Sequence, residues 1–217
     1  MSAWGQEVEA DLRWREAELA ALKTLCAKSS GDSQRAVLRA LWAMMYAHYE
    51  GFHKFCWDLL LDGVQREGLV RGAVSDTFAK LSLVSVFKKF RGDTSPDGIW
   101  DFVRTQMAME MGALASFPDK LETQSNLWPN VARDNNLKVN ISCGYLDSHE
   151  TKLKLIVSRR NEIAHGKKLV VEKLSEYQEY ENAALLVMHE LALAVIDCLD
   201  KKSYLAFPAL PPPGVPA

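Results

Sequence analysis

The chain has 217 residues, which is enough for one well-packed core and marginal for two domains. It is 48% hydrophobic and 25% charged, as is typical of globular proteins in water. Its formal net charge of -2 excludes the overall basic field of many nucleic-acid-binding proteins, so any RNA contact has to rest on a local basic patch.

The spacing of apolar residues predicts an all-α protein. Apolar side chains at helical intervals indicate helices over residues 6–27 and 34–62. The second helix has two candidate N-caps, Asp32 and Ser33. Its apolar stripe is the broadest in the chain, which predicts a central position. Gly51 lies inside this helix and favours close packing or a bend.

Two more helices are predicted near 76–90 and 97–115, and the second has Ser95 or Asp97 as its N-cap. The region 116–147 is predicted to be irregular because turn signals interrupt it. A short helix is expected to begin after Pro129, since proline fits a first helical turn. Strand content should be near zero, with "LKVNISCGY" as the only β-like run.

A helix is predicted from Ser148 to His165, where Gly166 supplies a C-terminal stop. The last long helix is expected over 174–203. The sum is a bundle of about five or six helices that forms one domain over residues 1–205. Residues 206–217 form a Pro-rich tail that is expected to be extended and disordered.

The signatures of common cofactor and metal enzymes are absent from the sequence, and no cofactor or metal is expected. The four cysteines lack a C-x-x-C pair, and all but Cys143 fall in apolar helical patterns typical of buried thiols. The charged N-terminus has no secretory h-region, and no segment approaches the apolar run of a membrane span. These features predict a cytoplasmic, reduced protein without membrane contact.

The charged stretch "SRRNEIAHGKK", residues 158–168, is the strongest candidate for chemistry. One interpretation is a helix end without further role, in which basic side chains favour the negative pole of the helix dipole. The spacing of the apolar residues favours a second interpretation, in which the stretch has a functional role. Arg160 continues the apolar stripe, where an arginine is unusual unless it is paired or functional. Arg159 and Glu162 are predicted to point outward, while Asn161 and His165 share an edge of the stripe.

Three segments in the right order resemble one family. "RRNEIAHGKK" is similar to the R-N-x-I-A-H-G signature of the HEPN superfamily (higher eukaryotes and prokaryotes nucleotide-binding). "LRALWAMMYAHYEGFHKF" resembles the "YAxxEGF" helix of its RiboL-PSP and MAE-type branch, and "ETQSNLWPNV" resembles the "S-N-L" segment between those helices. Together the matches cover most of residues 7–200.

The resemblance implies an all-α bundle that dimerises and a metal-independent endoribonuclease of a toxin or antiphage defence module, with an antitoxin or other defence-system partner. Arg160 and His165 would be the catalytic pair, Asn161 the polar residue after the arginine, and Glu50 the acidic residue of the neighbouring helix. HEPN toxins that a partner nucleotidyltransferase silences often carry a Tyr, the modified residue, two positions after the His. That position is Lys167 here, so the resemblance gives no support for control by adenylylation.

These residue types suit RNA cleavage, in which the 2′-hydroxyl of the substrate is the nucleophile. Histidine transfers protons near neutral pH, and arginine offers a fork of donors to phosphate. Asn161 would orient His165 or hold a phosphate oxygen, and Glu50 would pair with Arg160 or face solvent. The remaining basic residues of the stretch are predicted to contact the RNA: Arg159, Lys167 and Lys168.

The motif supplies one histidine, whereas acid–base cleavage uses two proton-transfer groups. An ideal helix places Arg160 and His165 about 140° apart, so a homodimer with a composite site is predicted. The rival is a monomeric site completed by His48 or His53, although His48 lies on an apolar stripe that favours a core role. Two non-enzymatic alternatives remain: a HEPN scaffold that dimerises or holds RNA, and a plain helical interaction protein.

Overall fold

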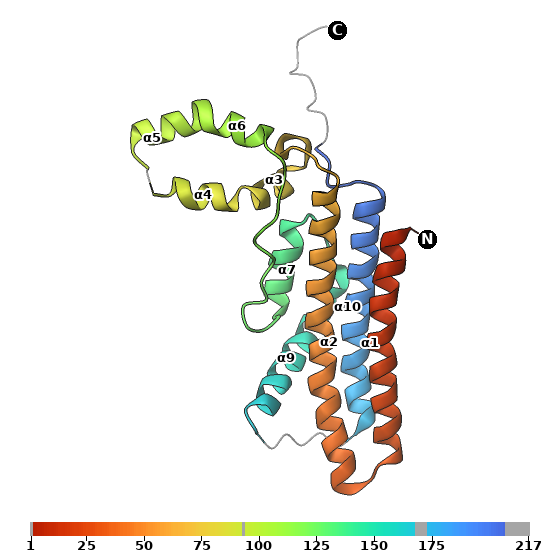
Figure 1. The fold of residues 1–217 in the computed structure, drawn as a ribbon. Helices are drawn as coiled ribbons and strands as arrows, with labels where there is room; N and C mark the ends of the chain where they lie inside the picture. The colour runs from red at the N-terminus through yellow and green to blue at the C-terminus, as the bar shows by residue number, and fades with distance from the viewer. Residues whose placement is uncertain (1, 93, 168–172, 207–217) are drawn as a thin grey trace.

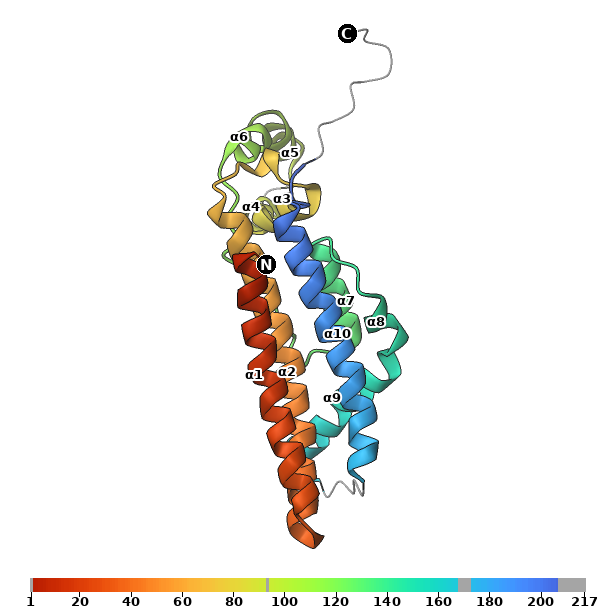
Figure 2. The same cartoon turned by 90° about the vertical axis from the view of Figure 1, so that its right-hand side faces the viewer.

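In the computed structural model, the described residues are 2–92, 94–167 and 173–206. Three long helices lie side by side as a bundle (Figures 1 and 2). They are α1 (Ala3–Lys28), α2 (Gly31–Arg66) and α10 (Leu174–Asp200). The predicted all-α class is confirmed, because the described parts of the chain contain only two isolated β-bridges and no strand.

The beginnings of the first two helices differ in their caps. The Ser2 hydroxyl accepts a hydrogen bond from the N–H of Gly5 at 3.1 Å and so caps α1. α2 begins earlier than predicted, at Gly31, and its N-cap Ser30 makes no side-chain bond. Asp32 and Ser33, the predicted caps, therefore lie in the first turn, where the acidic side chain still favours the helix dipole.

α2 is the central helix, as its broad apolar stripe predicted. It contacts α1, α9 (Glu150–Ala164) and α10, and it carries most of the largest fully buried side chains of the core, among them Trp42, Trp57, Tyr46, Tyr49 and Phe52. A Cβ atom at Gly51 would lie 2.9 Å from Nη1 of Arg15 on α1. The glycine thus serves close packing between α1 and α2.

A helical extension projects beyond one end of the bundle (Figure 1). It contains α3 (Asp76–Ser82), α4 (Val84–Phe90), α5 (Pro96–Asp101), the π-helical segment η2 (Phe102–Gln106) and α6 (Met107–Gly112). Ser95 caps α5 by accepting from the N–H of Gly98 at 3.1 Å, as predicted.

The helix predicted over 76–90 is broken at Leu83, which joins α3 to α4. The buried hydroxyl of Ser82 accepts hydrogen bonds from Nε of Arg71 at 2.8 Å and from the N–H of Ser116 at 3.0 Å, which fixes the break. Such breaks explain why the described residues hold more α-helices than the five or six predicted. Those of ten residues or more are five: α1, α2, α7 (Pro129–Lys138), α9 and α10.

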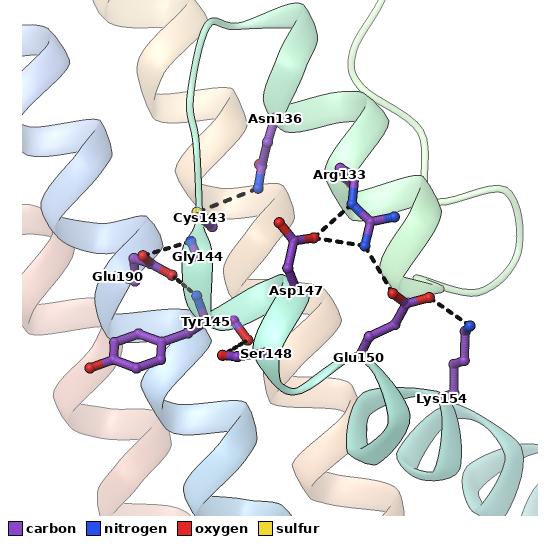
Figure 3. Close-up of polar contacts among 10 residues, drawn as sticks. All are labelled: Arg133, Asn136, Cys143, Gly144, Tyr145, Asp147, Ser148, Glu150, Lys154 and Glu190. Atoms are coloured by element: carbon purple, nitrogen blue, oxygen red, sulfur yellow. Dashed lines mark hydrogen bonds and ion pairs between the residues drawn. The ribbon is translucent and has the colours of Figure 1, made fainter.

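Polar contacts fix the start of α9 (Figure 3). Arg133 on α7 donates to Asp147 of α8 (Gly144–Ser148) at 2.8 Å and pairs with Glu150 at 3.2 Å. Glu190 of α10 accepts from the N–H groups of Gly144 and Tyr145 at 2.8 and 2.7 Å. These bonds attach the N-terminal end of α9 to α7 and α10. They therefore fix the direction of α9, which carries the charged stretch at its C-terminal end.

The four cysteines are free and buried, which confirms the prediction for Cys26, Cys56 and Cys198. Cys143 is buried as well, and its Sγ accepts from Nδ2 of Asn136 at 3.6 Å. Burial raises the pKa of the Cys143 thiol to about 12, so it stays protonated near neutral pH.

α10 is long and apolar enough to cross a membrane by length and composition alone, a feature that the sequence analysis missed. Half of its apolar window is buried inside the bundle, where α10 packs against α1 and α2. After α10, Tyr204 is buried and the N–H of Ala206 donates to Ala73 at 3.0 Å. The rest of the predicted tail, 207–217, lies outside the described residues.

Candidate functional site

α9 ends in a hydrogen-bonded glycine motif that places His165. Gly166 has φ +72°, in the left-handed region that favours glycine. Its N–H donates to the carbonyl of Ile163 at 3.0 Å, and the N–H of Lys167 donates to that of Glu162 at 2.9 Å. These two bonds form a Schellman motif. The predicted stop at Gly166 is confirmed, and His165 becomes the C-cap residue with an exposed side chain.

Arg160 points inward from α9, as its place on the apolar stripe predicted. Its guanidinium carbon lies 4.7 Å from the ring centroid of Tyr46 on α2, a cation–π contact. Its Nη1 donates to Oδ1 of Asn161 at 2.8 Å and to Oδ1 of Asn126 at 3.0 Å. The half-buried guanidinium is therefore held by α2, by α9 and by the loop before α7.

The loop that carries Asn126 has an unusual backbone. Gln124 and Ser125 are consecutive non-glycine residues with positive φ, 54° and 72°. The next residue but one, Leu127, is fully buried, and its N–H donates to the hydroxyl of Tyr46 at 2.7 Å. The three segments that resemble the HEPN family thus meet at one place in the fold.

Sequence reasoning did not select Tyr46 or Asn126 as site residues. Both lie inside the segments that carried the resemblance, "YAHYEGF" and "SNLWPN", so a signal for them was present. What was missing was any indication that these two side chains converge on Arg160.

Glu50 lies near Tyr46, one turn further along α2, and is half-buried. Burial is the main cause that raises the pKa of the Tyr46 hydroxyl to about 12, and the charge of Glu50 adds to it while that of Arg160 opposes it. Among the described residues no ion pair joins Glu50 to Arg160, so the predicted alternative of a direct pair is not formed. A catalytic role of Glu50 stays a prediction.

Asn161 orients Arg160 rather than His165. Its side-chain oxygen accepts from Arg160, whereas only its backbone carbonyl contacts His165, by accepting that residue's N–H at 3.0 Å. In the part of the chain that the structure describes, the imidazole of His165 has no hydrogen bond to Arg160 or to any other side chain. One chain therefore presents an oriented arginine and a separate, exposed histidine.

Arg159 does not point outward, and that prediction is wrong. Its guanidinium carbon lies 4.7 Å from the ring centroid of Trp42, and its Nη2 donates to Glu176 of α10 at 2.8 Å. The reason is that α9 packs against α10 as well as α2, so the flank that carries Arg159 is covered. Its predicted contact with RNA would have to involve the guanidinium nitrogens not used here.

Of the two lysines after His165, only Lys167 lies within the described residues. Lys167 is exposed, and its Nζ lies 3.7 Å from Oε1 of Glu162. Its carbonyl accepts from Nη1 of Arg39 on α2 at 2.9 Å, a tether that the sequence analysis did not anticipate. Lys168 lies outside the described residues.

His48 and His53 are buried in the core. Nε2 of His48 lies 2.8 Å from the carboxylate of Glu18, and the ring packs edge-on against Trp14. Nδ1 of His53 lies 2.7 Å from the carbonyl of Tyr49, and burial lowers its pKa to about 4. The predicted core role of His48 is confirmed, and neither histidine contacts Arg160 or His165.

The chain matches the family model for MAE_28990-like HEPN over residues 4–204. Comparisons with curated proteins and with solved structures find no match. The family match covers the whole bundle and all three segments that meet at Arg160. It indicates a nuclease-like or RNA-related function.

Proposed function

Because the chain belongs to the MAE_28990-like HEPN family, we propose that it is a metal-independent endoribonuclease in which Arg160 and His165 carry the chemistry. The observation that carries this proposal is the arrangement of the Arg160 guanidinium. It is held over Tyr46 and bonded through Nη1 to two neutral amide oxygens. A guanidinium oriented without a carboxylate partner keeps its full charge for a phosphate.

The reaction needs no group beyond the RNA and protein side chains. The 2′-oxygen attacks the adjacent phosphorus as its proton passes to a base, and the P–O5′ bond breaks as the 5′-oxygen receives a proton. The products are a 2′,3′-cyclic phosphate and a 5′-hydroxyl. His165 supplies proton transfer, and the Nε and Nη2 groups of Arg160 stabilise the charge that develops on the non-bridging oxygens.

The working unit that fits this chemistry is a homodimer. Two proton transfers are required, and each chain offers one exposed histidine at the end of α9, apart from its own Arg160. A two-fold axis beside α9 would bring two copies of both residues into one cleft and double the local positive charge. The burial of His48 and His53 leaves the monomeric rival without an accessible second histidine.

A toxin or antiphage defence module, with RNA as the substrate and an antitoxin or other defence-system partner, is the setting we propose from the family resemblance. Asn161 acts in this scheme through Arg160. Lys167 and Lys168 follow His165 directly and would add positive charge along the RNA backbone.

The test is cleavage of RNA in excess EDTA by wild type, Arg160→Ala and His165→Ala. Loss of a proton-transfer group typically lowers the rate by about 10²–10⁴-fold. Two matched controls are Arg66→Ala, which removes an arginine placed over the Trp4 ring at 5.8 Å, and His189→Ala, which removes an exposed histidine between α10 and α1. Both controls should cleave like wild type, and circular dichroism should show all four variants folded.

The second candidate function is a non-catalytic scaffold that dimerises or holds RNA. It is favoured by one observation, that the contacts of Arg160 lie within a single chain and would also serve to join α9 to α2. A structural arginine predicts that Arg160→Ala unfolds the protein while His165→Ala has no effect on any activity.

A further inference from the structure

The support of Arg160 comes from outside its own helix at only two points among the described residues. Asn161 is its neighbour on α9 and moves with it. The Tyr46 ring and the Oδ1 atom of Asn126 are the contacts that fix the guanidinium relative to the rest of the fold, at 4.7 Å and 3.0 Å. Of these, only Asn126 directs an individual guanidinium nitrogen.

The backbone that presents Asn126 is strained. Gln124 and Ser125 both occupy the left-handed region, which non-glycine residues adopt at an energetic cost. Such conformations persist where the surroundings enforce them, and they concentrate at functional sites. Here the N–H of Asn126 donates to Thr123 at 3.1 Å, and that of Leu127 donates to the Tyr46 hydroxyl. The same tyrosine therefore anchors both the loop and the guanidinium.

We infer that Asn126 is a positioning residue for Arg160, an inference that rests on the proposed ribonuclease function. By accepting a hydrogen bond from Nη1, Asn126 turns this nitrogen of the guanidinium toward the protein. The Nε and Nη2 groups of Arg160 are then left to bind the scissile phosphate. An amide is suited to this task because its oxygen accepts a hydrogen bond without a formal charge. A carboxylate at the same place would hold the guanidinium equally well but would neutralise the charge that the phosphate needs.

Removal of the amide separates this inference from a simpler one, that the bond only joins the 123–127 loop to α9. In that simpler case Asn126→Ala lowers the melting temperature but leaves kcat unchanged in folded protein. A positioning residue predicts that Asn126→Ala lowers kcat in folded protein. Asn126→Asp preserves the shape and the acceptor, and it should also lower cleavage because the new carboxylate competes with phosphate for Arg160.

The experiment compares wild type, Asn126→Ala, Asn126→Asp and Arg160→Ala on a short RNA in EDTA, with kcat and KM measured separately. Asn135→Ala is the comparison for loop attachment, because Nδ2 of Asn135 donates to the carbonyl of Glu122, the residue just before this loop, at 3.0 Å and makes no contact with Arg160. Asn126→Ala should lower kcat by up to about 10²-fold, the effect of a misplaced catalytic group. Its KM should change little, and Asn126→Asp should lose at least as much kcat.

A second readout does not depend on activity. In protein labelled with ¹⁵N-arginine, the Nη groups of Arg160 should give slowed rotation in wild type and averaged signals in Asn126→Ala, whereas Asn135→Ala should retain the wild-type signals. Wild-type kcat in Asn126→Ala, with Arg160→Ala inactive, would overturn the positioning role. Cleavage that is absent in wild type or untouched in Arg160→Ala would overturn the proposed function instead. In that case unchanged Arg160 signals in Asn126→Ala would also overturn the positioning.

Discussion

The substitution Gly166→Ala tests whether the end of α9 sets the position of His165. Gly166 has φ +72°, and among the described residues no atom beyond its chain neighbours lies within 4 Å of the place that a Cβ would occupy. The added methyl group therefore meets no steric clash there, and the main penalty is the left-handed backbone. That penalty is about 1–2 kcal/mol for a non-glycine residue, offset in part by the smaller entropy of the unfolded chain.

A net loss of about 1 kcal/mol corresponds to a decrease in melting temperature of about 2–4 °C for a domain of this size. Gly68→Ala is the matched control, since Gly68 follows the end of α2, has φ +64° and has equally open space, in the described part of the chain, where its Cβ would lie. Both variants should lose similar stability in thermal unfolding. Only Gly166→Ala should lose RNA cleavage, because relaxation of its strain displaces His165 at the neighbouring position. Gly166→Asn should recover part of the activity, as asparagine tolerates this conformation.

Two results would contradict this role of Gly166. If neither alanine variant is less stable than wild type, a non-glycine residue adopts the left-handed backbone at these two positions without a penalty. If both are destabilised and Gly166→Ala cleaves RNA like wild type, the Schellman motif does not fix a catalytic histidine.

Three further predictions concern the site and the core. Asn161→Ala should give a partial loss of cleavage, smaller than that of Arg160→Ala, because it removes one of the two oxygens that accept hydrogen bonds from Nη1 of Arg160. Equal losses of the two variants in a steady-state assay would contradict this. Light scattering after size exclusion should give the mass of a dimer, and a fully active monomer would contradict the composite site. Because the folded-state pKa of His53 is lowered to about 4, the protonated form is favoured in the unfolded chain, and stability should fall as pH drops from about 6.5 toward 4. Roughly 2–3 kcal/mol should be lost by pH 4.5, whereas denaturant unfolding of His53→Phe should lack that part of the pH dependence.

The features of the site that depend on one helix could be read from the sequence. The place of Arg160 on the apolar stripe and the stop at Gly166 follow from helical periodicity and from the preference of glycine for the left-handed region. The central position of α2 follows from the breadth of its stripe. The identification of the family rested on three short segments, and the match over residues 4–204 confirms it.

The features of the site that depend on contacts between two elements could not be predicted from the sequence. Asn126 lies 34 positions before Arg160, and only the packing of the fold brings their side chains together. Arg159 was wrongly predicted to point outward for the same reason. Periodicity describes the faces of α9 alone, and it does not show that α10 covers the face with Arg159 and supplies Glu176 as its partner. Asp32 and Ser33 were mistaken for caps because α2 begins two or three residues earlier than they imply, at Gly31, a glycine with positive φ.

Metal-independent cleavage by Arg160 and His165 is best tested by the end groups of RNA cut by purified protein in excess EDTA. Attack by the 2′-hydroxyl predicts fragments with 2′,3′-cyclic phosphate and 5′-hydroxyl ends, formed by wild type and lost in both Arg160→Ala and His165→Ala. Cleavage that disappears on chelation and returns with magnesium, or fragments that carry 5′-phosphate ends, would contradict it.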